Sequence, residues 1–421
     1  MIQTFPLLPG VTLRCCRDTR FRQGCLSLQF VRPQCHEEAA LNALLPTVLL
    51  RGCETAPDLR AITNRLDDLY GASVGTLVRR VGDYQTTGLS CAFMEDRFAM
   101  AGDEILAPMV RFLGQLLLRP VTENGAFCPD FVAGEKKNLI SAIESELNDK
   151  RAYAMGKLLR AMCKADSFGV PRLGTVEAVA AIDPQTLYEH YQRILRSSPV
   201  ELFYVGSAPG QTVAGLLKDM LCPIVRDYEP LPGQSPFHDG GGSHTAEPAE
   251  AAQSVLCMGF VTDITCACSQ FAAMQVLNTL FGAGMTSKLF MQVRERRSLC
   301  YAIGSGYYGS KGILTVSAGI DREQEQPVRQ EVLAQLEECR RGHITEAELE
   351  AAREALLSAL RGVYDSPGSI ESYFGTHLLN GAFRSPEQYR DEILGVTMED
   401  TVAAARTLRL HTTYFLKGAE K

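Results

Sequence analysis

The chain has 421 residues and a mass of 46.1 kDa, a length that suits two or three domains rather than one. Apolar residues make up 46% and charged residues 22%, so a substantial core can form. The formal net charge is −7. This mildly acidic balance argues against broad binding to a nucleic-acid backbone. No apolar run approaches the roughly 18 residues of a membrane span, so we expect no membrane partner either.

The cysteine pattern and the N-terminal residues both indicate a cytoplasmic protein. Fourteen cysteines are scattered along the chain without the spacing of a disulfide framework or of zinc and redox pairs. Reduced thiols in a cytosolic protein are the simplest interpretation. The first ten residues contain no basic residue and include Pro6 and Pro9, which makes a poor secretory signal.

In the first half, hydrophobic periodicity predicts nine elements in chain order. They are a strand at 24–31, helices at 37–50 and 58–70, strands at 72–81 and 85–93, helices at 96–118, 130–163 and 184–195, and a strand at 200–206. The short connection between the second and third strands permits only an antiparallel hairpin.

The second half repeats this order. The predicted elements are a strand at 253–261, helices at 267–281 and 287–296, strands at 301–308 and 312–320, helices at 326–341 and 345–364, shorter helices, and a strand at 412–417. Thr345, with Glu348 three residues later, is typical of a capping box at a helix start.

The stretch 229–249 is rich in Gly, Pro and Ser and predicts a flexible linker between two similar halves. Gly24 and Gln253, which begin matching strands, are 229 positions apart, as are Ala72 and Tyr301. Val200 and Thr412, which begin the last pair of matching strands, are 212 positions apart. The shared order and the similar offsets favour a duplication. We therefore predict an α+β protein with domains at 1–228 and 253–421, joined by a linker at 229–252.

No self-contained catalytic centre is visible in the motifs. None of the histidines forms a pair four residues apart, which a helical zinc motif requires; they are His36, His190, His238, His244, His343, His377 and His411. No phosphate-binding glycine loop or nucleophile elbow is complete either.

One segment, residues 282–301, stands out as a glycine turn that leads into an amphipathic helix and then a strand. Arg294 lies at the predicted helix end, where a cation complements the helix dipole. Tyr301 lies at the strand start. From the residues alone, the simplest interpretation is a surface arginine and a half-buried core tyrosine.

This segment resembles the second half of the pitrilysin/insulinase metallopeptidases, family M16. The residues in register with the family pattern are Ser287, Leu289, Phe290, Val293, Arg294, Glu295, Leu299 and Tyr301. The duplicated halves fit the family as well, and the run Asp67–Ala72 is similar to that of the YmfF-like group of bacterial M16 proteins. The resemblance implies two homologous domains, each a mixed, largely antiparallel sheet packed with helices.

The first half lacks the residues with which active M16 peptidases bind zinc. With Gly52 fixing the register, the two histidine positions hold Ala43 and Thr47, and the general-base position holds Pro46, which we expect to kink the helix. The position of the third ligand, a glutamate, holds Ala142. The resemblance therefore implies no metal, no cofactor and no catalytic residue in this chain alone.

In active relatives, the arginine and tyrosine of the second half help to hold substrate, and some members divide the work between two chains. The resemblance thus implies that Arg294 and Tyr301 bind a peptide substrate. It also implies a zinc-bearing M16 partner subunit, in a heterodimer, or a homodimer of this chain. We expect a non-catalytic subunit that closes over a peptide on its partner.

Two other functions stay open at this point. One is an active metallopeptidase with a displaced site, for example His36, Glu37 and a distant residue. The other is a purely structural or assembly role without substrate binding, like that of the respiratory-complex subunits that share this fold.

Overall fold

The computed structural model describes residues 2–146 and 148–419. The chain forms two compact units, and neither is continuous in sequence. The first unit contains the chain up to Glu144 together with Val170–Gly233 and Tyr364–Thr376. The second contains Ser145–Gly169, Gln234–Val363 and the chain from His377 onward. Among the described helices, none combines the length and hydropathy needed to cross a bilayer.

A six-stranded mixed sheet forms the centre of the first unit, in the order β1-β2-β8-β3-β5-β4. β3 lies antiparallel to both β5 and β8, whereas β2 runs parallel to β8. The strands are β1 (Ile2–Leu8), β2 (Val11–Arg17), β3 (Gln23–Pro33), β4 (Ser73–Val81), β5 (Tyr84–Met94) and β8 (Val200–Gly206). A separate two-stranded ribbon pairs β6 (Thr122–Glu123) with β7 (Ala126–Phe127).

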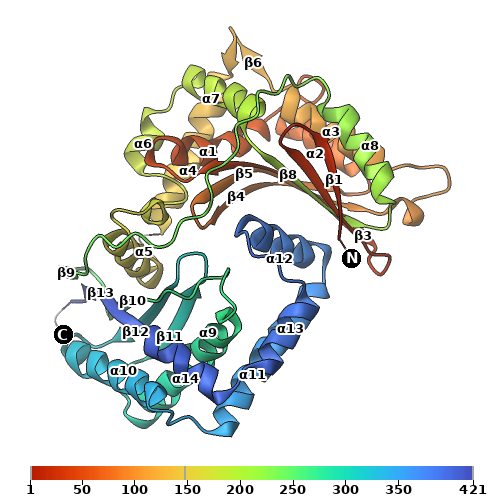
Figure 1. Ribbon diagram of the computed structural model, residues 1–421. Helices are drawn as coiled ribbons and strands as arrows, with labels where there is room; N and C mark the ends of the chain where they lie inside the picture. The colour runs from red at the N-terminus through yellow and green to blue at the C-terminus, as the bar shows by residue number, and fades with distance from the viewer. Residues whose placement is uncertain (1, 147, 420–421) are drawn as a thin grey trace. The chain divides into compact units, whose positions relative to one another are not determined.

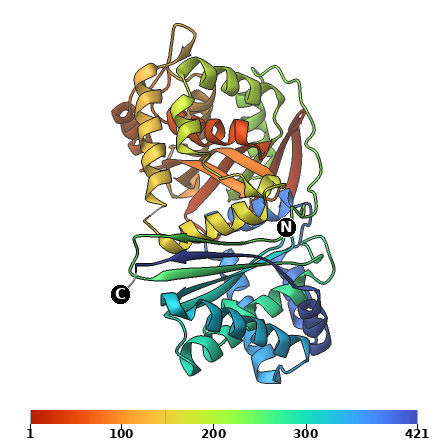
Figure 2. The same ribbon diagram turned by 90° about the vertical axis from the view of Figure 1, so that its left-hand side faces the viewer.

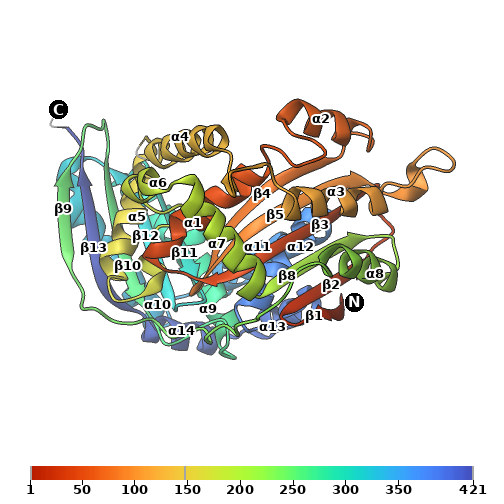
Figure 3. The ribbon, with the colours of Figure 1, turned by 90° about the horizontal axis from the view of Figure 1, so that it is seen from above.

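A five-stranded sheet forms the centre of the second unit, in the order β11-β12-β10-β13-β9, which Figure 3 shows from one edge to the other. The strands are β9 (His244–Pro248), β10 (Ser254–Val261), β11 (Ala302–Tyr308), β12 (Ile313–Ile320) and β13 (Arg409–Lys417). Every residue of β10 and β12 is buried, as expected for central strands covered on both faces.

The two sheets have the same topology. β4-β5-β3-β8-β2 corresponds to β11-β12-β10-β13-β9, and the strand at the end of each series runs parallel to its neighbour. β1 is an addition to the first sheet. The α+β fold and the duplicated architecture are therefore confirmed.

Helices of the first unit pack mainly on one face of its sheet (Figure 1). They are α1 (His36–Leu49), α2 (Leu59–Asp67), α3 (Leu106–Leu118), α4 (Pro129–Ser145), α6 (Val176–Ala181), α7 (Pro184–Ser197) and α8 (Gly210–Leu221). The helices that follow β10 in sequence are α9 (Phe271–Asn278), α10 (Glu325–Arg340), α11 (Glu346–Arg361), α12 (Pro367–Leu379), α13 (Pro386–Gly395) and α14 (Met398–Thr407). The predicted capping box of Thr345 and Glu348 begins α11.

Helix α5 (Lys150–Met162) comes from the first half of the sequence but belongs to the second unit. Figure 2 shows it along one face of the five-stranded sheet. Ala154 and Leu158 of α5 pack against Val255 and Cys257 of β10 in one apolar cluster. This contact removes the face of β10 from water, which stabilises the second unit.

Most of α12 makes the reverse exchange and belongs to the first unit. The carboxylate of Glu371, which is 3% exposed, accepts hydrogen bonds from Ser27, Gln29 and Arg79 at 2.7 to 3.1 Å. Phe374 stacks on Phe203 of β8. The predicted domain ranges 1–228 and 253–421 describe the two halves of the duplicated sequence. They differ from the compact units, because α5 and most of α12 each belong to the unit of the other half.

Two predicted helices are shorter than expected. The segment predicted as one helix at 96–118 begins with a short 3-10 turn, Asp96–Phe98, and a loop. The helix itself, α3, starts only at Leu106. The Asp96 carboxylate accepts from the backbone N–H groups of Ile105 and Leu106 and so fixes the start of α3. The helix predicted at 130–163 stops at Ser145, and Asp149 then caps α5.

The predicted flexible linker contains ordered structure. β9 pairs with β13. Before it, the backbone N–H of His238 donates to the Asp166 carboxylate at 3.0 Å. Asp166 also pairs with the fully buried ammonium of Lys311 at 3.1 Å, and that ammonium donates to the carbonyl of Ser235 at 3.1 Å. A buried ion pair thus holds part of this segment in place.

Candidate functional site

The degenerate zinc positions in α1 belong to the core of the first unit. Ala43 is 2% exposed, and Pro46 is buried beside it. The Thr47 hydroxyl donates to the Leu44 carbonyl at 2.8 Å and is therefore engaged within the helix. Ala142 lies on the exposed side of α4. Neither the alanines nor the proline offers a side-chain atom that could bind a metal.

Across residues 2–146 and 148–419, the structure shows no group of three His, Cys, Asp or Glu side chains that could hold a metal ion. His36 and Glu37, considered above for a displaced site, are exposed in the first turn of α1.

Pro46 does not end the helix, because a neighbouring strand compensates for its missing N–H. In an α-helix this N–H would bind the carbonyl of Asn42, four residues earlier. Instead, the Thr87 hydroxyl of β5 donates to the Asn42 carbonyl at 2.6 Å. The helix continues to Leu49. The residue that replaces the general base is thus accommodated by a buried hydrogen bond.

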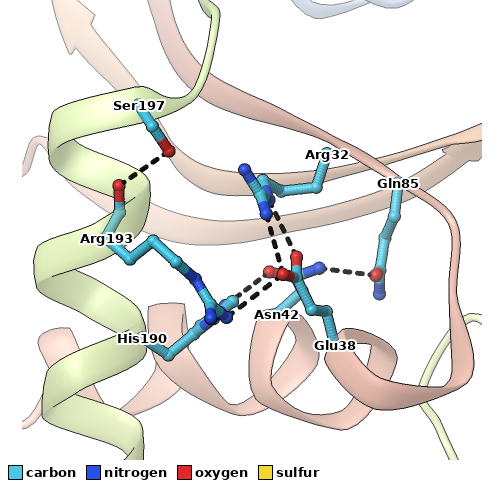
Figure 4. Close-up of polar contacts among 7 residues, drawn as sticks. All are labelled: Arg32, Glu38, Asn42, Gln85, His190, Arg193 and Ser197. Carbon is cyan, nitrogen blue, oxygen red and sulfur yellow. Dashed lines mark hydrogen bonds and ion pairs between the residues drawn. The ribbon is translucent and has the colours of Figure 1, made fainter. Parts of the chain in front are cut away.

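The side chain of Asn42 connects α1 to β5 and α7 in a buried polar network (Figure 4). Its Nδ2 donates to Gln85 Oε1 at 2.9 Å, and its Oδ1 lies 2.8 Å from Nε2 of His190. The other imidazole nitrogen, Nδ1, lies 2.8 Å from the Arg193 guanidinium, so it accepts and Nε2 donates. Burial lowers the pKa of His190 to about 4, which keeps the ring neutral at pH 7.

Glu38 connects the same network to β3. Its carboxylate accepts two hydrogen bonds from Arg32, at 2.7 and 2.8 Å, and one from Arg193 at 3.1 Å. Burial raises the pKa of Glu38, but the hydrogen bonds from Arg32 and the charges of Arg32 and Arg193 together outweigh burial and hold the pKa below its ordinary value. Together these contacts fix α1 as a structural element.

Arg51, just after α1, contacts α4. Its guanidinium lies 3.3 Å from the Glu135 carboxylate and 5.4 Å from the centre of the Phe131 ring. Glu135 lies on α4. It is 8% exposed and serves here as an ion-pair partner of Arg51.

The segment of residues 282–301 in the second unit, which carries Arg294 and Tyr301, differs from α1 in its backbone structure. Two π-helical segments, Thr279–Ala283 and Phe290–Arg296, flank the glycine turn. Ser287, Leu289 and Val293 are buried and anchor the segment. π-Helical turns are rare and occur frequently at functional sites, and periodicity had predicted only an ordinary helix here.

The turn between this π-helix and β11 depends on Ser298, whose φ of 49° lies in the left-handed region. Its backbone N–H bonds to the Arg294 carbonyl at 3.1 Å, and the N–H of Leu299 bonds to the Val293 carbonyl at 3.0 Å. Such a left-handed residue closes a helix end and reverses the chain. Arg294 and Tyr301 therefore stand on either side of one tightly closed turn.

Both predicted binding side chains are accessible. The Arg294 side chain is 41% exposed, lies 4.7 Å from the centre of the Phe290 ring and pairs loosely with Glu295 at 3.6 Å. Tyr301 is 49% exposed. Its hydroxyl donates to the Asp321 carboxylate at 2.9 Å, a partner that the sequence analysis missed because Asp321 follows a different strand, β12. Arg294 thus lies at the surface, and about half of Tyr301 is accessible to solvent.

The fold and these two regions define a class of protein: a duplicated α+β protein with the peptidase-type architecture, whose metal-binding positions hold alanine, proline and threonine. A comparison with protein families matches residues 181–356 to the Peptidase M16 inactive domain. The Probable inactive metalloprotease YmfF of Bacillus subtilis is 26% identical over 98% of this chain and 96% of its own length.

Solved structures agree with this class. A conserved protein from Enterococcus faecalis is 27% identical, covers 100% of this chain and 99% of its own, and superposes with a TM-score of 0.93. An M16 inactive domain from Pseudomonas fluorescens is 16% identical over 100% of this chain and 98% of its own, with a TM-score of 0.80, and shares the fold. The chain is therefore similar to M16 peptidase-like proteins over its whole length, and residues 181–356 match the model of the family's inactive domain.

Proposed function

We propose that this chain is the non-catalytic subunit of a two-chain peptidase, in which it binds an extended peptide and contributes Arg294 and Tyr301 to a zinc-bearing M16 partner. The observation that carries the proposal is the exposure of both side chains, on a turn whose supporting residues are buried. A purely structural segment would have no need to present an arginine and a tyrosine to solvent from a left-handed turn.

The two side chains suit complementary tasks on a peptide. A guanidinium binds carbonyl or carboxylate oxygens through several N–H donors, and a tyrosine hydroxyl can donate to the oxyanion of a tetrahedral intermediate. The Tyr301 hydroxyl has a single proton, which it now gives to Asp321. Donation to a substrate therefore requires that the hydroxyl leaves Asp321. In the free protein, the bond to Asp321 keeps the Tyr301 ring in position.

Mixing experiments with a zinc-bearing M16 chain that has an intact H-x-x-E-H motif test the proposal. We expect this chain to raise the partner's kcat/KM on an unfolded peptide. Arg294→Ala and Tyr301→Phe should each reduce the stimulated rate by about 100-fold, the typical loss for one oxyanion donor. Arg296→Ala is the matched control, because Arg296 lies on the same π-helix and, among the residues that the structure describes, its side chain hydrogen-bonds to Gln292 alone.

Other outcomes would assign a different role. A stable complex without stimulation would indicate a structural or assembly function. A self-associated chain that ignores the partner would indicate a homodimer. One zinc ion per chain, or peptide cleavage by the chain alone, would overturn the proposal.

A further inference from the structure

The first unit contains a cavity of about 630 Å³ where β5 and β8 end and α3 and α8 begin. Small-molecule sites have volumes of this order and combine a mostly apolar lining with a few convergent polar groups. This cavity has such a lining: apolar side chains, among them Phe93, Leu106 and Leu216, surround the carboxylate of Glu95. The cavity is therefore a candidate for a site that binds a small ligand.

Glu95, which directly follows β5, is 4% exposed. Its Oε2 accepts hydrogen bonds from the backbone N–H of Ser207, at 2.8 Å, and from the Ser207 hydroxyl. Its Oε1 accepts from the Tyr204 hydroxyl at 3.4 Å, which is longer than the usual O–H···O distance of about 2.5–3.0 Å. Because each carboxylate oxygen can accept more than one hydrogen bond, Oε1 keeps capacity for a further donor.

The donors to Glu95 are all neutral. In the part of the chain that the structure describes, no lysine, arginine or histidine forms an ion pair with this carboxylate. Two arginines line the cavity. The guanidinium of Arg97 donates to the carbonyls of Thr19 and Phe21 instead, and Arg111 is exposed on α3. A buried charge is normally paired, because its removal from water is costly, so Glu95 suits a cation that enters the cavity.

Two glycines leave the space that this carboxylate occupies. A Cβ atom at Gly24 of β3 would lie 2.4 Å from Glu95 Oε1, and a Cβ atom at Gly206, the last residue of β8, would lie 2.3 Å from it. Both distances are far shorter than a van der Waals contact, so a larger residue at either position would displace Oε1. The backbone on both sides thus defines the position of the carboxylate beside the cavity.

We propose that this cavity binds a ligand with a primary ammonium group on an apolar stem, and that Oε1 of Glu95 accepts from the ammonium. The cation balances the buried charge and gives charge-assisted hydrogen bonds, which are about twice as strong as neutral ones. The apolar lining covers the stem and removes it from water. The ammonium belongs either to a free amine or to the first residue of a peptide. This site goes beyond the proposed function, because it uses neither Arg294 nor Tyr301.

Isothermal titration calorimetry with the full chain tests the inference. The probes form two pairs, each with a cationic and a neutral member: phenethylamine with phenethyl alcohol, and leucinamide with N-acetyl-leucinamide. At about pH 6.5 both amines are protonated, since an α-amino group has a pKa near 8. We expect at least one ammonium probe to bind about tenfold more tightly than its neutral counterpart. The pair with the difference identifies the source of the ammonium.

Variants then assign the preference to Glu95. Glu95→Gln keeps the size of the side chain and removes its charge, so it should weaken the ammonium probe about tenfold and the neutral probe less than about twofold. Glu104→Gln is the matched control, because Glu104 is an exposed carboxylate at the same cavity; it should change neither. Gly24→Ala keeps the charge but displaces Oε1, so it should also weaken the ammonium probe and gives a second test should Glu95→Gln not fold.

Three results would overturn the inference. The first is equal binding of the ammonium probes and their neutral counterparts. The second is an equal effect of Glu104→Gln and Glu95→Gln, which would indicate a general attraction of cations rather than a site at Glu95. The third is that no probe binds at millimolar concentration, in which case Glu95 only connects the ends of β5 and β8. None of these results affects the proposed function, which the mixing experiments test separately.

Discussion

Helix α1 and the segment of residues 290–301 occupy the two motif positions of the family, and their side chains have opposite environments. Ala43 is 2% exposed and packs in the core of the first unit. Arg294 and Tyr301 are 41% and 49% exposed. The comparison teaches that the buried motif positions of α1 contribute to stability, whereas the arginine and tyrosine contribute little to it. Substitutions in the two regions should therefore separate into losses of stability and losses of binding.

The largest loss of stability should come from returning histidine to α1. Ala43→His inserts an imidazole into a packed core and buries its polar atoms, so we expect the free energy of unfolding to fall by about 3 kcal/mol, measured by urea denaturation. Ala142→His, at the exposed position on α4, should change it by less than about 0.5 kcal/mol. Equal stability of both variants would break the comparison, because Ala43 would then not be a core position.

Acid should weaken the network around α1 through His190. The pKa of His190 is about 4 in the folded chain and 6.5 in its ordinary state, so the unfolded chain takes up a proton between these pH values and the folded chain does not. The contribution is fully present above pH 6.5 and decreases as the pH falls toward 4, by at most about 3 kcal/mol. Urea denaturation at pH 7 and pH 5 measures the change.

His190→Gln provides the control for that titration. Glutamine can still donate to Asn42 but does not titrate, so the variant should lose less stability than the unaltered chain over this pH range. Glu38, whose pKa is lowered, adds a loss of its own only at lower pH, since its ordinary pKa is 4.5. Identical pH profiles for both chains would contradict a neutral, buried His190.

The hydrogen bond that accommodates Pro46 should contribute about 2 kcal/mol. Thr87→Val keeps the shape of the side chain but leaves the Asn42 carbonyl buried without a donor, and an unsatisfied buried group costs about 1–3 kcal/mol. Pro46→Ala restores the N–H of the helix at that carbonyl. In the Pro46→Ala background the cost of Thr87→Val should be much smaller, and an unchanged cost in this double-mutant cycle would refute the compensation.

The smallest changes in stability are expected in the exposed segment. Arg294→Ala and Tyr301→Phe should each alter the free energy of unfolding by less than about 0.5 kcal/mol, although we expect both to impair peptide processing. Thermal and urea denaturation of the purified variants give the values. A loss of stability above about 2 kcal/mol for either variant would contradict this expectation and favour a structural role for the segment.

Much of this fold could be predicted from local sequence patterns, because the secondary structure of these segments depends mainly on residues close to one another in the sequence. The alternation in residues 200–206 predicted β8 with its observed bounds, and Thr345 marked the start of α11. The two N-terminal strands were not predicted; Pro6 and Gly10 interrupt their short alternating runs. The side chains of Asp96 and Asp149 cap the starts of α3 and α5. No proline marks these boundaries, and hydrophobic periodicity alone did not identify them.

The candidate site shows a different limit. The family motif predicted Arg294 and Tyr301, but not their surroundings. The contact of Thr87 with the Asn42 carbonyl spans 45 residues, and that of Tyr301 with Asp321 spans 20. Neither spacing has a local signal. Periodicity likewise predicts that α5 has an apolar face, but not which sheet that face covers.

The exchange of α5 and α12 has a consequence for cleavage of the chain. A protease that cuts once near Gly241 would leave two fragments, each of which contains a helix that belongs to the other unit. The fragments should remain associated after cleavage and elute together in gel filtration. Each fragment expressed alone would lack one helix that packs on its sheet, whereas co-expression should restore both units.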